Sequence, residues 1–459
     1  MRAKLLFGLV FLASCTANLP VAKEVQLTFD MSKNHDLDNN DNFSPDGKWL
    51  VYDTRTGIGG IGGSPSVEQV NVETGEIQVL FGIPENKDWG PGAGAVSFHP
   101  TENRVIFIHG LSVCTPENPY QQWRRTGVMV NTGQPNVSVY MDSRDVTFPF
   151  TPGALRGGTH RHEWSRDGQW VGYTYNDAIM KHLEDSTGVK WNLRTIAVST
   201  QKHKATVDPD PDPDPENVQG EWYSAVVVRV VPNPEPGSDE ISNAASDSWI
   251  GASGYRKPDG ILQVARAFIG KVMSKTGQPV DELFVVDIPD SINVPGEFGP
   301  LEGTKTSFPM PPKGTVQRRL TYTAESKYPG VGGVVRSSSD GKYISYLAKD
   351  SLGIQQIFLM SPVEGKPIQL TWHASNVQSG VRWSPDNQSV YYIWENSIVC
   401  CEVSDRSFEK RFRRLTEQSG NEISNLVVSN EGKLLAFNRT LPVEGSKDGK
   451  KQIFCIKLK

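Results

Sequence analysis

Asn42-Phe-Ser-Pro-Asp-Gly-Lys-Trp-Leu-Val-Tyr52 is the stretch that decides the fold, because it recurs in recognisable form along the chain. Each copy places a short apolar strand, a Ser-Pro-Asp-Gly type of turn and a second apolar strand in succession, which is typical of a β-hairpin. The further copies are Glu163–Tyr173, Ser337–Tyr346, Trp383–Tyr392 and Val428–Phe437, with a degenerate copy at Phe98–Phe107.

A second repeated element, Leu-Thr after a polar residue, precedes several copies. Leu320, Leu370 and Leu415 carry it at intervals of 50 and 45 residues, the length of a four-stranded blade. The repeats therefore predict an all-β fold, a β-propeller of four-stranded blades.

The number of blades follows from the visible copies and the gaps between them. Six copies are visible, and the interval between Ser165 and Ser338 has room for one more. Strand-like runs in that interval are 224–231, 260–269 and 282–287. We predict seven blades, with eight as the alternative. The early strand at 25–29 has no blade before it, so we expect it to complete the last blade and close the ring.

The N-terminus has the layout of a bacterial secretory signal, with basic residues, an apolar run over 5–12 and Ala13-Ser14-Cys15. The run is too short to span a membrane as a helix. Leu-Ala-Ser-Cys resembles a lipobox, so Cys15 is the predicted lipidation site, with an ordinary cleaved signal as the alternative. We expect membrane contact only through this N-terminal lipid anchor, in the bacterial cell envelope (periplasm or outer membrane).

The predicted layout is a signal peptide with a lipobox at 1–15, a linker at 16–24 and a single propeller domain at 25–459 with inserted loops at 204–220 and 296–314. The acidic, proline-rich run at 208–216 in the first loop is typical of a stiff solvated segment. The formal charge of −5 and the absence of a Lys/Arg run argue against a nucleic-acid partner.

The Leu-Thr and Ser-Pro-Asp-Gly pattern resembles the TolB-type propeller repeats. The chain is also similar to the YidR-like family of propeller proteins, through 151–162 (Thr-Pro-Gly-Ala-Leu-Arg-Gly-Gly-Thr-His-Arg-His), 174–177 (Thr-Tyr-Asn-Asp) and 236–241 (Pro-Gly-Ser-Asp-Glu-Ile). That likeness implies no established activity. A looser resemblance to the oligogalacturonate and ulvan lyases implies β-elimination on a uronic-acid glycan by His, Tyr and Arg in the central cleft. No full lyase motif is present.

His160 and His162 are the sharpest candidates for chemistry. They come just before Trp164, on the segment that leads into an innermost strand, and two residues apart on an extended strand they share a face. His182 follows the Tyr175-Asn176-Asp177 turn, which we expect to bring it back toward the same rim. The three imidazoles suit acid/base work or a divalent metal, and the sequence leaves that choice open.

Uronate β-elimination needs a cation for the carboxylate, a base and a proton donor. We predict His160, His162, His182 and Tyr223 as catalytic groups. The predicted substrate-binding groups are Arg156, Arg256, Tyr255 and Trp222. A glycoside hydrolase stays open as a third possibility, since Glu163, Asp177 and Asp239 could meet across the cleft.

These observations favour an enzyme, a carbon–oxygen lyase that acts on an acidic ulvan-like or pectin-like polysaccharide or oligosaccharide. The alternative is a non-catalytic TolB-like envelope propeller that binds a protein or glycan. Convergence of His160, His162 and His182 with an Arg or Tyr around one small molecule distinguishes the two, because without it the binding interpretation is better.

Overall fold

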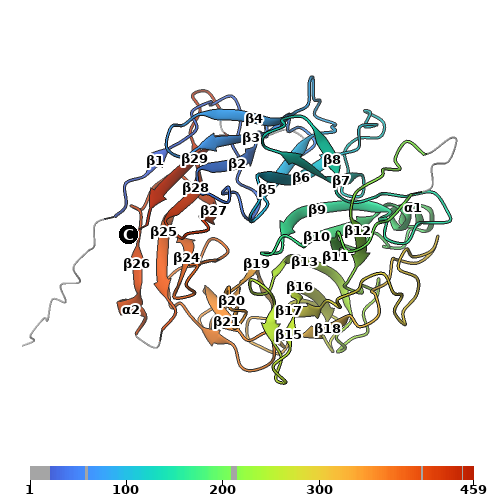
Figure 1. Ribbon diagram of the computed structural model, residues 1–459. Helices are drawn as coiled ribbons and strands as arrows, with labels where there is room; N and C mark the ends of the chain where they lie inside the picture. The colour runs from blue at the N-terminus through green and yellow to red at the C-terminus, as the bar shows by residue number, and fades with distance from the viewer. Residues whose placement is uncertain (1–20, 57–59, 208–213, 405–406, 447, 459) are drawn as a thin grey trace, which may run out of the picture.

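The structure, a computed structural model, describes residues 21–56, 60–207, 214–404, 407–446 and 448–458. The predicted signal peptide with Cys15 lies outside the described residues, as do residues 208–213 of the acidic loop. Small antiparallel sheets surround a common axis, and each presents its first strand to the axis (Figure 1). In the described part of the chain there are seven such blades, so the chain is a seven-bladed β-propeller, as predicted.

The blades follow one another along the chain, and their strands run from the axis outward in sequence order, except that β1 forms the outermost strand of blade 7. Blades 1 to 3 consist of β2 (Trp49–Asp53), β3 (Ser66–Asn71) and β4 (Ile77–Gly82); β5 (Ala93–Phe98), β6 (Arg104–Gly110), β7 (Arg125–Asn131) and β8 (Ser138–Tyr140); and β9 (Gly157–Trp164), β10 (Trp170–Asp177), β11 (Thr195–Thr200) and β12 (Tyr223–Val226). Blades 4 and 5 consist of β13 (Ile241–Trp249), β16 (Ala265–Met273), β17 (Pro279–Asp287) and β18 (Val316–Arg319); and β19 (Val331–Ser337), β20 (Ile344–Lys349), β21 (Gln355–Met360) and β22 (Ile368–Gln369). Blades 6 and 7 consist of β23 (Arg382–Trp383), β24 (Ser389–Trp394), β25 (Ser397–Glu402) and β26 (Phe412–Arg414); and β27 (Ile423–Val428), β28 (Leu434–Leu441), β29 (Lys450–Lys457) and β1 (Val25–Gln26).

The ring is closed by the two ends of the described chain. Val25 pairs with Cys455 and Gln26 with Phe454, so β1 forms the outer strand of blade 7 (Figure 1). The predicted closure is therefore confirmed. It protects the outer edge of β29, which would otherwise offer unpaired backbone groups.

Blade 4 is the copy that the repeat pattern does not reveal. Its innermost strand, β13, is followed by a hairpin of β14 (Tyr255–Arg256) and β15 (Leu262–Gln263) in place of the Ser-Pro-Asp-Gly turn. The predicted strand runs at 260–269 and 282–287 correspond to parts of β15, β16 and β17. The blade is present, but its diagnostic turn has been replaced.

The repeated turn has a clear local cause. In blade 1 the Ser44 hydroxyl donates to Asp46 Oδ1 at 2.7 Å and accepts the Trp49 N–H at 2.9 Å, which ties the two strands together. Gly47 has φ of 70°, a left-handed conformation that glycine adopts without cost. The Ser-Pro-Asp-Gly motif thus encodes the hairpin between the first and second strand of each blade that carries it.

A bulge interrupts the innermost strand of blades 2, 3, 4, 5 and 7. Strand registers shift there, and one residue of each bulge has positive φ. These residues are Ala95, Arg161, Ser246, Gly333 and Asn425. A bulge adds one residue to one strand, so the alternation of side chains is broken at that point. It decides which side chains reach the axis.

The described chain contains little helix. The helices are α1 (Ala178–Thr187), which follows β10, and the single turn α2 (Phe408–Arg411) in blade 6. No helix among the described residues is long and apolar enough to cross a membrane.

Candidate functional site on the propeller axis

His160 is the predicted histidine that reaches the axis. It lines a cavity of about 120 Å³ together with Arg161, Arg194 and Arg336. Burial, followed by the charges of nearby Arg125, Arg194 and Arg161, holds the pKa of His160 well below its ordinary value. The imidazole is therefore neutral near neutral pH and is surrounded by guanidinium groups.

His162 points elsewhere, and the prediction that it shares a face with His160 is wrong. Arg161 between them has φ of 59° and sits in the bulge of β9, so the two-residue alternation fails. The His162 ring lies between blades 2 and 3, where its Nε2 is 2.9 Å from Thr159 Oγ1 and its ring centroid is 5.3 Å from that of Tyr173. Burial lowers its pKa to about 3. His162 therefore has a structural role in the packing between blades 2 and 3.

His182 does not join His160 either. It is exposed on α1, which Figure 1 places at the outer edge of the ring. The Asp177 side chain accepts the Met180 N–H and so starts this helix directly after β10, where a turn back to the rim was expected. The predicted cluster of three histidines is therefore wrong.

Tyr223 and Trp222 lie on the outer side of blade 3. Tyr223 belongs to the outermost strand β12, is 6% exposed and packs beside His203 at 5.8 Å between ring centroids. Burial raises its pKa to about 12. Trp222 is fully buried with its ring against Trp164 at 5.5 Å. Neither lines the described axial cavities, so their predicted cleft position is wrong.

Arg156 is fully buried and forms an ion pair with Asp177 at 2.8 Å. Its Nη1 donates to Thr304 O at 2.6 Å, so it anchors the inserted loop at 296–314 and does not face the cleft.

Tyr255 and Arg256 lie on the hairpin of blade 4. The Tyr255 hydroxyl donates to Asp287 Oδ1 at 2.8 Å, whereas Arg256 is exposed and donates to Gly260 O at 3.1 Å. Neither residue lines the described axial cavities, which contradicts their predicted place as subsite residues.

A second axial cavity, of about 380 Å³, opens on the side of the repeated turns. Asn40, Glu163 and Arg336 line both axial cavities, so the two are contiguous along the axis. The larger one adds Asp41, Arg166, Arg382 and the rings of Trp164, Trp249 and Trp383. Together the two cavities form an axial site with many cations.

Glu163, Arg336 and Arg382 occupy equivalent positions on the innermost strands of blades 3, 5 and 6. Each lies two residues before the serine that begins the turn. The corresponding residues of other blades, Asn42, Ser97, Ser248 and Val427, carry no charge. Sequence reasoning missed the two arginines, although the aligned repeats place a charge at this position in only these copies. This difference in charge between the aligned repeats is the feature of the sequence that could have identified the two arginines.

Two carboxyl groups meet at the axis. The Asn40 amide donates to Glu163 Oε1 at 3.1 Å and to Asp41 Oδ2 at 3.2 Å. Glu163 also forms an ion pair with Arg266 at 3.0 Å. Burial and then the charge of Glu163 raise the pKa of Asp41 to about 6. Asp41 therefore keeps a proton over part of the range below neutral pH.

The predicted grouping of Glu163 with Asp177 and Asp239 is wrong. Asp177 is paired with Arg156, and Asp239 lies 3.5 Å from Arg319 and is more than half exposed. The carboxyl group that lies near Glu163 is that of Asp41.

The axial residues do not fit a metal held by histidines. His162 lies in the interface between blades 2 and 3, and His182 lies on α1, so of the three predicted histidines His160 alone lines an axial cavity. Among the described residues, no group of three or more His, Cys, Asp or Glu side chains is arranged to hold a metal ion. The cations at this axis are guanidinium groups.

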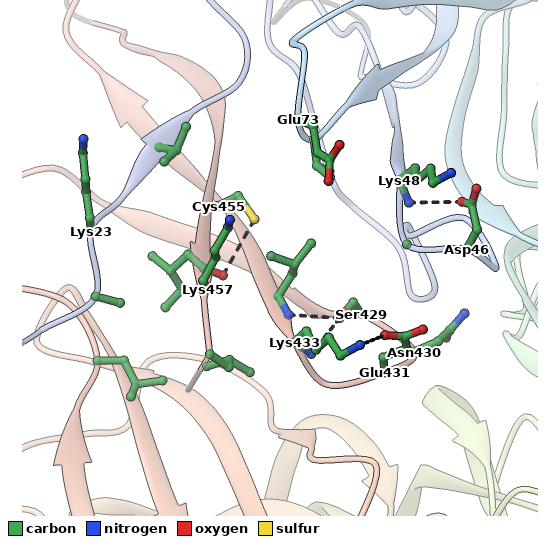
Figure 2. A pocket seen from close by; sticks show the side chains of 18 of the residues that line it. Lys23, Asp46, Lys48, Glu73, Ser429, Asn430, Glu431, Lys433, Cys455 and Lys457 are labelled. Carbon is green, nitrogen blue, oxygen red and sulfur yellow. Dashed lines mark hydrogen bonds and ion pairs between the residues drawn. The ribbon is translucent and has the colours of Figure 1, made fainter.

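A larger cavity, of about 1070 Å³, lies away from the axis along blade 7 and is bordered by residues of blades 1 and 6 (Figure 2). Its lining combines apolar side chains, such as those of Val72, Leu434 and Ile456, with charged groups, among them Lys433, which pairs with Glu431. It adjoins the described ends of the chain at 21–25 and 455–458. The axial cavities instead bring together buried charged side chains, those of Glu163 and Arg336, so the axis is the better candidate site.

Solved structures define the class of the fold. The chain is similar to an oligogalacturonate lyase in complex with manganese, with a TM-score of 0.54, 10% identity and coverage of 96% of this chain and 95% of that chain. An oligogalacturonate lyase from Vibrio parahaemolyticus has a TM-score of 0.52 and 10% identity over 95% and 94% of the two chains. The polysaccharide lyase Uly1 has a TM-score of 0.51 and 10% identity over 96% and 100%. The chain thus shares the propeller fold of these proteins.

The family follows from sequence. The chain is 35% identical over 426 residues to the Uncharacterized protein YidR of Escherichia coli (strain K12), which covers 90% of this chain and 94% of the relative. The model of a protein family of unknown function (DUF3748) matches residues 92–212. The chain belongs to the YidR family.

Proposed function

We propose that this chain is a lyase that cleaves a uronic-acid polysaccharide or oligosaccharide by β-elimination at the axial site. The observation that carries the proposal is a neutral imidazole, His160, on the same cavity wall as Arg161, Arg194 and Arg336. The β-elimination of a uronate needs a base and a cation close together, because a cation beside the carboxylate lowers the barrier to removal of the C5 proton. The similar fold of the lyases supports the proposal.

The reaction needs no group beyond those that line the axis. Guanidinium groups bind the carboxylate, and an imidazole nitrogen of His160 takes the C5 proton. The C4–O bond breaks, the C5–H electron pair becomes the C4=C5 double bond, and the departing oxygen receives a proton. Asp41, whose pKa is raised to about 6, is the proposed donor. The bound carboxylate also offsets the arginine charges and so raises the basicity of His160.

The proposal includes the cell envelope as the place of action, with Cys15 as the lipid anchor. This part rests on the signal-like sequence at 1–15 alone. Acidic glycans lie outside the inner membrane, so export of the chain is consistent with the proposed substrate. Labelling with a radioactive fatty acid tests it: incorporation that is lost in Cys15→Ala is expected, and equal incorporation in both contradicts the anchor.

A screen on acidic glycans tests the activity. The purified mature chain is incubated with pectate, ulvan, alginate and glycosaminoglycans, and the absorbance of unsaturated uronate is followed. We expect product from at least one glycan and loss of product in His160→Ala. Absence of the double bond in every product would contradict the lyase proposal.

One observation favours the second candidate, a propeller that binds an acidic glycan without cleaving it. Only His160 of the four predicted catalytic groups reaches the axis, as given above, and the predicted convergence fails. Binding without a change in the glycan, measured on the same panel by titration calorimetry and product analysis, identifies this case.

A further inference from the structure

Arg336 is buried and Arg382 is half-buried, and neither guanidinium group forms an ion pair with a carboxylate of the described chain. Arg336 is 8% exposed, and both residues line the larger axial cavity. Among the described residues, no carboxylate lies within ion-pair distance of either guanidinium, whereas Arg266 nearby pairs with both Glu163 and Asp247. A buried charge without a partner is costly.

The hydrogen bonds of these two side chains leave donors free. Arg336 Nη1 donates to Val335 O at 2.9 Å, and Arg382 Nη1 donates to Val381 O at 3.2 Å, each the carbonyl of the preceding residue. The Nε atom of each is buried, and within the described chain it has no hydrogen-bond partner. Unsatisfied buried donors beside a cavity indicate an acceptor that comes from outside.

The neighbouring carboxyl groups do not supply that acceptor. Glu163 is engaged by Arg266 and the Trp249 N–H. The pKa of Asp41 is raised, so the arginines do not hold Asp41 as a firm counter-ion. Burial, and then the repulsion between the two guanidinium groups, lowers the pKa of Arg382 well below its ordinary value. An added anion would relieve this repulsion.

We propose that Arg336 and Arg382 form an oxyanion-binding site at the turn-side mouth of the axial channel, which takes a carboxylate or sulfate group of an acidic glycan. Because Arg336 lines both cavities, this group belongs to a sugar next to the one at His160. The position of that neighbour rests on the proposed function, whereas the anion chemistry does not. The ligand is therefore a glycan with charges on consecutive sugars.

Sodium sulfate is the first probe, titrated by calorimetry at constant ionic strength against the wild type and the variants Arg336→Gln, Arg382→Gln and the double variant. We expect sulfate affinity to fall roughly tenfold or more in each single variant, because each loses charged hydrogen bonds. Arg256→Gln, at an exposed arginine outside the channel, is the matched control and keeps wild-type affinity. Equal sulfate affinity in the double variant and the wild type would overturn the proposal.

Folding is checked in the same series, with Arg382→Met as a second variant that keeps an unbranched apolar stem but carries no charge. Removal of one of two repelling cations is expected to leave or raise the melting temperature without sulfate, and to abolish the rise that sulfate causes in the wild type. A sulfate-induced rise of wild-type size in folded Arg382→Met would contradict the site.

Oligouronides of increasing length then separate this site from the lyase activity. We expect Arg382→Gln, which lies outside the cavity at His160, to lose the gain in affinity between a monosaccharide and a longer oligouronide, and to bind the monosaccharide as the wild type does. An unchanged gain with length contradicts the neighbouring subsite. If no glycan yields a double bond but sulfate binding still depends on the arginines, the proposed lyase function fails and the oxyanion site stands.

Discussion

His160 and His162 lie two residues apart on β9, yet they belong to different regions of the molecule. The axial region around His160 is open to a cavity and holds arginines whose charges face it. The region around His162, between blades 2 and 3, is closed, and the nearby buried Asp142 has a pKa raised to about 7 by burial. Both regions contain buried titratable groups with unsatisfied atoms. Of the cavities described above, those on the axis reach such atoms and none includes His162 or Asp142, so a ligand can satisfy the unsatisfied atoms at the axis.

The comparison shows that an unsatisfied buried polar group indicates a binding site only where a cavity reaches it. Both His160 Nδ1 and His162 Nδ1 lack a hydrogen-bond partner within the described chain. The two histidines differ in their access to a cavity. The bulge at Arg161 turns the His160 imidazole toward the axis and the His162 imidazole into the blade interface. Each prediction below tests this difference between the axial region around His160 and the inter-blade region around His162.

The largest expected effect is the loss of activity in His160→Ala. Removal of the base is expected to lower kcat about 10²- to 10⁴-fold, because general-base catalysis contributes that much. His182→Ala, at an exposed histidine on the outer helix, is the matched control and keeps wild-type kcat. Formation of unsaturated uronate measures both. Equal activity in His160→Ala and the control would break the division between the two regions.

The pH dependence of kcat/KM tests the axial acid. Asp41 must carry a proton, so activity is present below its pKa of about 6 and falls roughly tenfold per pH unit above it. His160 must be neutral, and its pKa is lowered, so the acid limb lies well below pH 6.5. Asp41→Asn is expected to lose most activity and the fall above pH 6. A rate that climbs from pH 6 to pH 8 would argue against Asp41 as the donor.

The inter-blade region is expected to affect stability and not catalysis. His162→Ala removes a fully buried ring and its contact with Thr159, and we expect the free energy of unfolding to fall by about 2 kcal/mol. Urea denaturation measures it. The kcat of the folded variant is expected to match the wild type. A stable but inactive His162→Ala would place this residue in the catalytic machinery after all.

The same residue makes stability depend on pH. The pKa of His162 is lowered to about 3 in the folded chain, so the unfolded chain binds more protons between pH 6.5 and pH 3. Its contribution is complete above pH 6.5 and is lost as the pH falls toward about 3. The difference in unfolding free energy between the wild type and His162→Asn is therefore expected to shrink over that range. A constant difference would mean that the ring is not buried in the neutral form.

The smallest expected effect concerns the bulges. Ser246 adopts φ of 57° in the bulge of β13, and Ser246→Gly removes a steric cost that is roughly 1–2 kcal/mol per residue but adds backbone entropy to the unfolded chain. We expect a gain in unfolding free energy of less than about 1 kcal/mol. Thermal unfolding checks it, with Ser339→Gly at an exposed turn as the control, which is expected to lose stability.

The fold was largely predictable from the repeats, because each Ser-Pro-Asp-Gly turn carries its own hydrogen bonds and needs no distant partner. Blade 4 escaped the pattern since its turn is replaced by the hairpin β14–β15. The site was not predictable in the same way. Spacing along an extended strand assigns His160 and His162 to one face, and a bulge, which depends on tertiary packing, separates them.

The axial arginines show the other limit of sequence reasoning. Arg336 and Arg382 lie in different blades, and their proximity results from the closure of the ring. Arg156, Tyr223 and Tyr255 were predicted from their chemistry, but each has a buried partner or packing role elsewhere in the blades. Residue type alone did not separate these roles.

The most direct test is a crystal structure of His160→Ala with the uronate oligosaccharide that binds most tightly in the glycan panel. The account predicts a sugar on the propeller axis, with one carboxylate within hydrogen-bond distance of Arg161, Arg194 or Arg336 and the next anionic group at Arg382. An oligosaccharide bound on the outer surface, with the axial channel free of sugar, would contradict it.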